Sequence, residues 1–313
     1  MHQASSSEEP AAIVLANFGH AVAVQLPDGR VVRAQPLQKI ALLVAGDRVV
    51  CEQPLEDDEQ TWRVVELVKR RTVLTRPDRR AKLKALAANV TQLLVVCAPR
   101  PAPDTLLLDQ FLAAGRNAGI EPVLVLNKSD LLPAVASPSD QDPLTLLAAY
   151  ADAGFATLTC HTTSAEGLQS LHECIGGETS VLVGQSGVGK SSIADVLLPD
   201  QDIRIGAISA ATGAGAHTTT VSFYYELESG GALIDSPGVR EFLVDHLDAQ
   251  ELRAGYPEID GLAAECRFHN CAHAAEPDCA VKQAISEGSL ATFRYDNWLK
   301  LSSASASGRK VHR

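Results

Sequence analysis

Short alternating runs of apolar and polar residues occupy the first part of the chain, between about residues 11 and 68. A period of two is typical of half-buried strands, and several short strands in succession predict a small barrel or sandwich. The simplest interpretation is a five-stranded OB-type barrel, and periodicity alone fits an SH3-like barrel as well. The expected strands are Ile13–Ala16, Ala21–Leu26, Val31–Ala34, Asp47–Cys51 and Trp62–Val68.

From about residue 72 to 243, continuous apolar runs alternate with segments of helical spacing. Leu93–Ala98 and Pro122–Leu126 are apolar almost throughout, as expected for strands buried on both faces, and Asp104–Ala118 has helical spacing. This alternation predicts a parallel sheet covered by helices. The further expected elements are helices over Leu144–Ala153 and Glu166–Ile175, and strands over Phe155–Cys160 and Ser180–Val183.

After residue 245 the pattern becomes helical and irregular. Two short helices, Ala280–Glu287 and Leu290–Leu301, are expected to close the chain's last domain. The final residues, SSASASGRKVHR, have the composition of a disordered basic tail.

Composition limits the class of protein. With 313 residues, of which 46% are hydrophobic, the chain can bury sizeable cores. Its longest apolar runs fall far short of the ~20 residues of a membrane span. The first residues, MHQASSSEEP, lack the basic start and apolar stretch of a secretory signal. We therefore expect a cytoplasmic protein with no membrane contact.

The formal net charge of −11 hides two basic segments. Residues 63–84 contain nine basic and two acidic residues, and residues 294–313 contain five and one, which gives net charges of +7 and +4. Such patches allow RNA binding that weakens steeply with salt, and a solvated helix face near Arg79–Lys84 is the alternative. The basic residues are Arg63, Lys69, Arg70, Arg71, Arg76, Arg79, Arg80, Lys82, Lys84, Arg294, Lys300, Arg309, Lys310 and Arg313.

A complete phosphate-binding motif follows the strand that ends at Val183. The sequence GQSGVGKS matches G-x-x-x-x-G-K-[ST] and precedes a helical segment. Glycines let backbone N–H groups turn inward around phosphate oxygens, Lys190 would reach the β- and γ-phosphates, and Ser191 would hold Mg²⁺. The motif does not distinguish ATP from GTP. The predicted contacts are Gly184, Gln185, Ser186, Gly187, Val188, Gly189, Lys190, Ser191 and Ser192.

A second motif, Asn127-Lys128-Ser129-Asp130, follows the strand Pro122–Leu126. An aspartate here can accept hydrogen bonds from guanine N1–H and the 2-amino group, which adenine does not present together. Alone, the four residues are equally consistent with an ordinary turn before a helix. Thr163-Ser164-Ala165, also at a strand end, would let the backbone of Ser164 and Ala165 contact the guanine oxygen.

Two further segments complete a nucleotide switch. In Asp235-Ser236-Pro237-Gly238, Asp235 would hold Mg²⁺ through water and the Gly238 amide would meet the γ-phosphate. A threonine after His217, for which we take Thr219, would complete the metal shell. The stretch around it is rich in Gly and Ala and also fits a flexible loop, and switch loops of this kind become ordered around the γ-phosphate.

The order of these five elements is informative. The base-reading motif at 127 and the Thr-Ser-Ala segment at 163 precede the phosphate loop at 184, whereas small GTPases have the opposite order. The motifs therefore indicate a circularly permuted GTPase domain. The permutation leaves the Asp235–Gly238 switch next to the C-terminal domain, and we expect the γ-phosphate state to reach residues 246–313 through this covalent link.

Cysteines and a histidine gather near the C-terminus in the pattern Cys266-x4-Cys271-x-His273-x5-Cys279. Three thiolates and one imidazole form a Cys₃His set for a closed, structural zinc site. Buried free thiols are the alternative, and His269 is a competing ligand. The other four of the seven cysteines stand singly in apolar runs and are expected in the core.

Together the motifs resemble the RsgA (YjeQ) family of circularly permuted GTPases. The resemblance rests on GQSGVGKSS (184–192), AHTTT (216–220), DSPG (235–238) and CRFHNCAHAAEPDCAV (266–281). It implies an α/β P-loop GTPase fold with three domains: an OB-fold RNA-binding domain (1–71), the permuted GTPase domain (72–245), and a helical zinc-binding domain with a basic tail (246–313). The family usually has G-R-H-T-T, whereas Ala216 precedes His217 here.

The resemblance implies a GTP hydrolase that acts late in maturation of the small (30S) ribosomal subunit, contacts rRNA and is stimulated by the subunit. We also expect Mg²⁺ with GTP, one structural zinc and a monomer. Val239 stands where a Ras-like enzyme has its water-orienting glutamine, so intrinsic turnover should be slow. His217 is the candidate to orient the attacking water, alongside Lys190. The rival classes are a metabolic P-loop kinase and a zinc-finger nucleic-acid binder.

Overall fold

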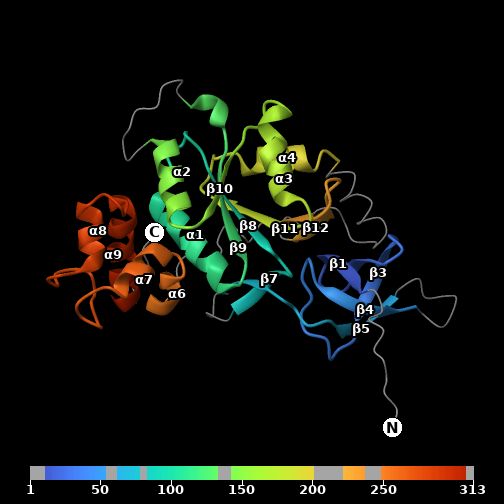
Figure 1. The fold of residues 1–313 in the computed structure, drawn as a ribbon. Coiled ribbons are helices and arrows are strands. Elements are labelled where there is room, and N and C mark those ends of the chain that lie inside the picture. Colours follow the sequence, from blue (N-terminus) through green and yellow to red (C-terminus); the bar gives the residue numbers. More distant parts are fainter. Residues whose placement is uncertain are drawn as a thin grey trace, which may run out of the picture. The chain divides into compact units, whose positions relative to one another are not determined.

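The computed structural model describes residues 11–53, 62–77, 83–132, 142–200, 221–236 and 248–307. Figure 1 shows its fold as a ribbon. The chain divides into two units. The first comprises residues 1–90, 177–180 and 195–239, and the second comprises residues 91–176, 181–194 and 240–313. None of the helices in the described ranges combines the length and apolar character needed to cross a membrane.

A closed five-stranded barrel forms the N-terminal part of the first unit. Neighbouring strands follow the order β1-β2-β3-β5-β4, and β1 also pairs with β4, which closes the ring. The β3–β5 pair is parallel and the other pairs are antiparallel. This topology agrees with the expected OB-type barrel. The strands are β1 (Ala12–Asn17), β2 (Val22–Gln25), β3 (Val31–Pro36), β4 (Arg48–Glu52) and β5 (Trp62–Leu67).

A two-stranded hairpin follows the barrel, formed by β6 (Val73–Pro77) and β7 (Leu83–Ala88). Lys84 therefore lies in a strand, so the alternative of a helix face near Arg79–Lys84 is wrong for the described part of that segment. The Ala88 N–H donates to Ala45 O at 3.0 Å. A Cβ on Gly46 (φ +87°) would lie 2.2 Å from Ala88 O, so only glycine permits this close approach.

A second hairpin of the first unit pairs β12 (Phe223–Glu226) with β13 (Ala232–Asp235). Strand β12 also pairs with β1 of the barrel, with Phe223 opposite Ala16. Neither strand of this hairpin was among the expected elements, although Ala232–Ile234 is an apolar run directly before the predicted switch residue Asp235.

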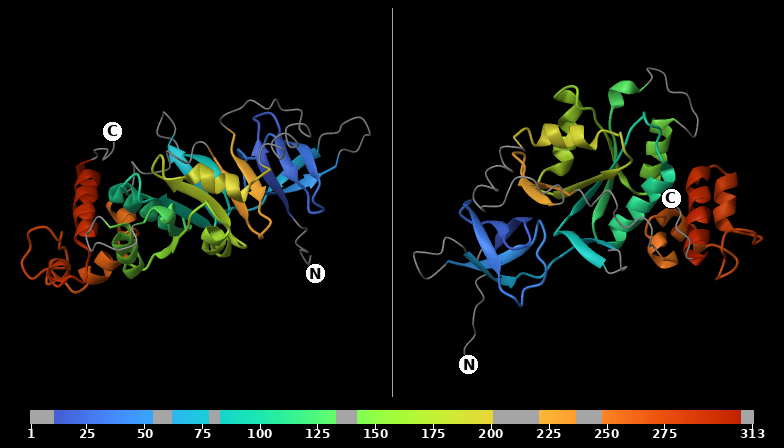
Figure 2. Two further views of the ribbon diagram at one scale, coloured as in Figure 1. Left: turned by 90° about the horizontal axis from the view of Figure 1, so that it is seen from above. Right: turned by 180° about the vertical axis from the view of Figure 1, so that it is seen from behind.

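The second unit is built on a sheet in the order β10-β9-β8-β11, in which the β10–β9 and β9–β8 pairs are parallel. Every residue of β8 is buried, which explains its continuous apolar run. Helices α1 and α2 lie on one face of the sheet and α3 on the other (Figures 1 and 2). The elements are β8 (Gln92–Cys97), α1 (Thr105–Asn117), β9 (Glu121–Leu126), α2 (Pro143–Asp152), β10 (Ala156–Thr159), α3 (Gln169–Ile175) and β11 (Thr179–Gly184).

Among the described residues, four further helices follow residue 248 in the second unit, and α6 and α9 contact α1. They are α6 (Ala249–Arg253), α7 (Pro257–Ala263), α8 (Ala280–Ser286) and α9 (Thr292–Ser307). Helix α9 continues to Ser307, so residues 302–307 are helical rather than part of the expected disordered tail. The remainder of that tail lies outside the described residues.

Candidate functional site: a nucleotide loop and a thiol–imidazole cluster

The phosphate-binding motif forms the turn between β11 and α4 (Lys190–Leu197), as the sequence predicts. Three of its glycines have positive φ: Gly184 (+135°), Gly187 (+82°) and Gly189 (+97°). The Lys190 ammonium donates to the carbonyl oxygens of Gly184 (2.7 Å) and Gln185 (2.6 Å). The lysine charge is therefore held over the loop, beside the N-terminus of α4, where an anion is favoured.

The base-reading motif lies directly against this loop. Asn127 is 1% exposed, and its Nδ2 donates to Val188 O at 2.9 Å. Lys128, with φ of +57°, donates from Nζ to Gly187 O at 2.6 Å. The exposed Asp130 follows in a 3-10 turn, Ser129–Leu131. Two motifs about 60 residues apart in sequence thus form one site at the carboxyl end of the sheet, which is where open α/β sheets bind ligands.

Cys160 is a neighbour of this site that the sequence analysis assigned only to the core. It follows β10 directly, its carbonyl oxygen accepts from Ser129 N at 3.0 Å, and its Sγ lies 3.6 Å from Asn127 Oδ1. Burial raises the pKa of the Cys160 thiol to about 11, so the group stays protonated and can donate to the amide oxygen. Its position directly after a strand is the feature of the sequence that could have predicted this contact. Ser164 and Ala165 lie further along, in the exposed turn before the 3-10 segment Glu166–Leu168.

The predicted switch residues fall in the first unit or outside the described residues. Asp235 is the exposed last residue of β13. Ser236 is 7% exposed, and its Oγ accepts from Ser222 Oγ at 2.6 Å. His217, Thr219, Gly238 and Val239 lie outside the described residues.

The predicted metal ligands Cys266, Cys271, His273 and Cys279 come together in the second unit. Their ligand atoms all lie within 4.8 Å of one another, whereas His269 is exposed and outside the group. Cys266 Sγ lies 3.6 Å from His273 Nδ1 and 3.8 Å from Cys279 Sγ, and Cys279 Sγ lies 3.5 Å from His273 Nδ1. A tetrahedral zinc with ordinary bond lengths separates such atoms by about 3.5–3.8 Å, so the group fits the ion.

Surrounding groups hold this cluster in place. Glu276 accepts hydrogen bonds from the backbone N–H groups of Ala272, Ala274 and Ala275, which lower its pKa to about 2. The Tyr295 hydroxyl donates to His273 O at 2.6 Å. The loop that carries the ligands is therefore organised by its own carboxylate and by helix α9.

A buried charge network connects α1 with the C-terminal helices. Asp109, fully buried in α1, accepts from the hydroxyls of Tyr150 (2.6 Å) and Tyr256 (2.8 Å), from Asn297 Nδ2 (2.8 Å) and from Arg294. Arg294 also donates to Glu258 Oε1 at 2.7 Å and to Gly255 O at 2.6 Å. This network could not be predicted from the sequence, because its members lie on different helices and no local pattern joins them.

The structure also changes the inventory of basic residues. Arg294 is 1% exposed, so it does not contribute to a basic surface. Arg70 donates to both carboxylate oxygens of the fully buried Asp47, at 2.6 and 2.7 Å, so its charge is neutralised. Arg79, Arg80 and Lys82 lie outside the described residues. The predicted patches are therefore smaller than the sequence count suggests.

Comparisons with known proteins agree with this architecture. The model of the RsgA GTPase family matches residues 67–245. Relatives named small ribosomal subunit biogenesis GTPase RsgA include that of Chromohalobacter salexigens, 43% identical over 91% of this chain and 83% of its own length, and that of Alcanivorax borkumensis, 40% identical over 94% and 84%.

Solved structures show the same fold. The crystal structure of YloQ, a circularly permuted GTPase, matches with a TM-score of 0.73 at 23% identity and covers 99% of this chain and 100% of its own. That of YjeQ from Thermotoga maritima matches with a TM-score of 0.70 at 25% identity, over 97% and 99%. The predicted permuted GTPase fold is thereby confirmed.

Proposed function

The chain belongs to the RsgA GTPase family, and we propose that it hydrolyses GTP as a late assembly factor of the small ribosomal subunit. The observation that carries the GTPase assignment is the direct contact between the base-reading motif and the phosphate loop, through Asn127 and Val188. A phosphate loop alone does not select a base, whereas a base-reading motif held against it does. The names of the relatives support the small subunit as the partner.

In this proposal the backbone of Gly184–Ser192 surrounds the phosphates and Lys190 pairs with the β- and γ-phosphate oxygens. Asp130 accepts from guanine N1–H and the 2-amino group, and Ser164 and Ala165 remain the proposed contacts of the guanine oxygen. Asn127 and Lys128 hold the base pocket and the phosphate loop together.

Mg²⁺ is expected with GTP, held by Ser191 and through water by Asp235, with Thr219 completing its shell. The ion would neutralise charge that develops between the β- and γ-phosphates. Gly238 is assigned to the γ-phosphate and His217 to the attacking water. These two residues and Thr219 lie outside the described residues, so their roles are proposed from the sequence pattern alone.

We assign one structural zinc to Cys266, Cys271, His273 and Cys279, since four protein ligands leave no open position for catalysis. We further assign rRNA binding to the N-terminal domain, residues 1–71, GTP hydrolysis to 72–245 and zinc binding to 246–313. A monomer in the cytoplasm, where ribosomal subunits are assembled, completes the proposal.

The deciding experiment measures GTP turnover by the purified chain with and without small ribosomal subunits. We expect slow intrinsic turnover, because Val239 cannot orient water, and a marked acceleration by subunits. Lys190→Ala should abolish both rates. Tight ATP binding with indifference to GTP would favour a kinase, and full biological activity of Lys190→Ala would favour a zinc-dependent nucleic-acid binder.

A further inference from the structure

Cys160 contacts the base-reading turn of the second unit at three points. Its backbone N–H donates to Leu126 O at 3.0 Å, its carbonyl oxygen accepts from Ser129 N at 3.0 Å, and its Sγ donates to Asn127 Oδ1 at 3.6 Å. Cys160 and Asn127 are each 1% exposed. Two of the contacts are made by the backbone and remain after a side-chain substitution, so the thiol contact can be tested by itself.

The direction of the thiol contact is fixed by its neighbours. A backbone carbonyl only accepts hydrogen bonds, so Asn127 must present Nδ2 to Val188 O, which lies 2.9 Å away. The amide oxygen Oδ1 then faces Cys160 and can only accept, so the thiol must donate. Burial raises the pKa of this thiol to about 11, so the proton that it donates is present at neutral pH.

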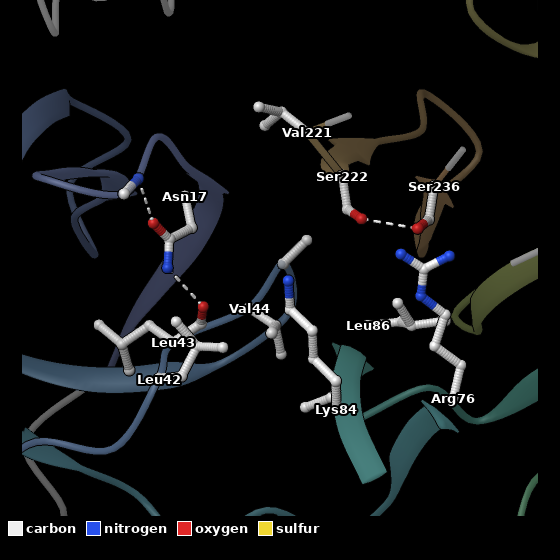
Figure 3. Close-up of a pocket in the computed structure, with 13 residues that line it drawn as sticks. Asn17, Leu42, Leu43, Val44, Arg76, Lys84, Leu86, Val221, Ser222 and Ser236 are labelled. Atoms are coloured by element: carbon white, nitrogen blue, oxygen red, sulfur yellow. Dashed lines mark hydrogen bonds between the residues drawn. The ribbon is translucent and has the colours of Figure 1, made fainter. Parts of the chain in front are cut away.

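A second side-chain pair beside a predicted motif does not fix a direction in this way. Ser222 and Ser236 line a pocket of the first unit, where their hydroxyl oxygens lie 2.6 Å apart (Figure 3). Each hydroxyl can rotate and can donate or accept, so this pair has two possible arrangements. The Cys160–Asn127 pair has one, because a carboxamide turned over would point its oxygen at Val188 O.

The thiol is the donor on which the Asn127 amide depends. Among the described residues, Cys160 Sγ is the one group that donates to Asn127 Oδ1. Because both residues are buried, water does not take its place. Removal of the thiol therefore leaves a buried acceptor unpaired, which is unfavourable. The amide is then free to turn over, and that movement breaks its bond to Val188 O.

We propose that Cys160 is a positioning residue for guanine nucleotides, whose thiol holds the Asn127 amide in the orientation that joins the base-reading turn to the phosphate loop. Cys160 contacts no nucleotide in this proposal and acts through Asn127. The inference rests on the proposed function, because it explains how the base-reading turn is kept in register with the loop. It gives a role to a cysteine whose place in an apolar run indicated only packing.

Loss of the thiol should weaken ligands that carry a base more than ligands that do not. Without its donor the Asn127 amide populates two orientations, and the apparent affinity falls in proportion to the population of the competent one. The phosphate loop has separate supports in Lys190 and Lys128, both of which donate to carbonyl oxygens of the loop. A ligand without a base, such as inorganic tripolyphosphate, should therefore bind almost unchanged.

The test measures the affinities of the full chain for GDP, a non-hydrolysable GTP analogue and tripolyphosphate by isothermal titration calorimetry. In Cys160→Ala we expect both nucleotides to bind about tenfold more weakly, and tripolyphosphate to bind within about twofold of the unaltered chain. In Cys160→Ser, which keeps a donor at this position, nucleotide affinity should return to within about threefold. An equal loss for all three ligands in Cys160→Ala, or no rescue by serine, overturns the proposal.

Cys97→Ala is the matched control. Cys97 is the last residue of β8 and is 2% exposed, and the hydrogen bond that it receives from Asn127 N, at 2.9 Å, goes to its backbone oxygen and is kept by the substitution. The two alanine variants remove similarly buried thiols, so both should lose comparable thermal stability. Cys97→Ala should nevertheless change nucleotide affinity by less than about twofold. Equal losses of affinity in the two variants would assign the effect to packing and overturn the proposal.

A double-mutant cycle shows whether Cys160 acts through Asn127. In an Asn127→Ala background, Cys160→Ala should weaken GDP binding by less than about a further twofold, because the thiol has no amide left to hold. A further loss of about tenfold in that background overturns the proposal. If the unaltered chain binds neither nucleotide, the proposed function is wrong as well. If it binds them and Cys160→Ala binds them equally tightly, only the positioning role is wrong.

Discussion

At the scale of single residues, two glycines determine how closely the phosphate loop approaches its neighbours. A Cβ on Gly184 would stand 2.1 Å from Val96 O, and a Cβ on Gly189 would stand 2.3 Å from Asn127 Nδ2. Both distances are far below van der Waals contact. The glycines of the motif therefore serve the packing between motifs as well as the exposure of backbone N–H groups to phosphate.

Gly189→Ala should lower GTP affinity at least about tenfold, or about 1.4 kcal/mol, because the new methyl group displaces Asn127 from Val188. The measurement is titration with a fluorescent GTP analogue. Gly177→Ala is the control: Gly177 also has positive φ (+80°), but no atom lies within 4 Å of its added Cβ. It should cost about 1–2 kcal/mol of stability and leave affinity unchanged. Equal affinity losses would contradict the steric argument.

The sequence predicts residues well where a function needs a contiguous motif. The phosphate loop and Asn127–Asp130 lie where strand-end reasoning puts them, because the chemistry fixes residue types at fixed spacing. Cys160 was not predicted as their neighbour, because its contact with Asn127 spans 33 residues and depends on strand order. The spacing of Cys266, Cys271, His273 and Cys279 indicated the ligand set, whereas only the coordinates separate His273 from His269.

At the scale of elements, the joint between α1 and the C-terminal helices rests on a buried ion pair. Asp109 and Arg294 are 0% and 1% exposed in their side chains, and they are separated by 185 residues. Arg294 also lies over the rings of Tyr150 and Tyr256, 5.0 and 4.2 Å from their centroids. Such a pair stabilises only while every partner is present, since each charge was taken out of water.

Arg294→Ala should lower the free energy of unfolding by about 3–5 kcal/mol, because it leaves Asp109 buried without its cation. Urea unfolding followed by Trp298 fluorescence measures this, since Trp298 packs on Tyr256, and a Trp62→Phe background removes the second tryptophan. Arg253→Ala is the control: it breaks only the exposed 3.6 Å pair with Asp260, and should cost about 0–1 kcal/mol. Similar losses of unfolding free energy in the two variants would show that the buried pair does not hold α1 to the C-terminal helices.

The elements themselves were predicted unevenly, for physical reasons. Continuous apolar runs gave β8 and β9 within a residue or two, because a strand buried on both faces has no polar positions. The β6–β7 hairpin was missed because its strands show neither a continuous apolar run nor a clear alternation of apolar and polar residues. Helix α9 extends through Ser307, where a serine-rich composition suggested disorder. A helix that is packed over its first turns continues here into a segment whose own helix propensity is low.

At the scale of the whole molecule, the permuted order has a consequence for communication between nucleotide and C-terminal helices. The Asp235–Gly238 switch precedes residues 248–307 in the chain, with residues 239–247 between them. The structure adds a second connection, in which Gln185 Oε1 of the phosphate loop accepts from the backbone N–H of Asp104 at 3.3 Å. Asp104 caps α1, the helix that carries Asp109. The phosphate loop is thus connected to the C-terminal helices through the chain that follows Gly238 and through the Gln185–Asp104 hydrogen bond.

We therefore expect residues 248–307 to be more protected from hydrogen exchange with a non-hydrolysable GTP analogue than with GDP. The γ-phosphate should restrain the switch that precedes α6, and restraint at one end of a packed helical cluster raises its opening free energy. Mass spectrometry of peptides from this range makes the measurement. Gln185→Ala separates the two connections: if the difference survives, the covalent link carries it, and if it disappears, the Gln185–Asp104 contact does. Equal protection in the two nucleotide states of the unaltered chain would contradict both.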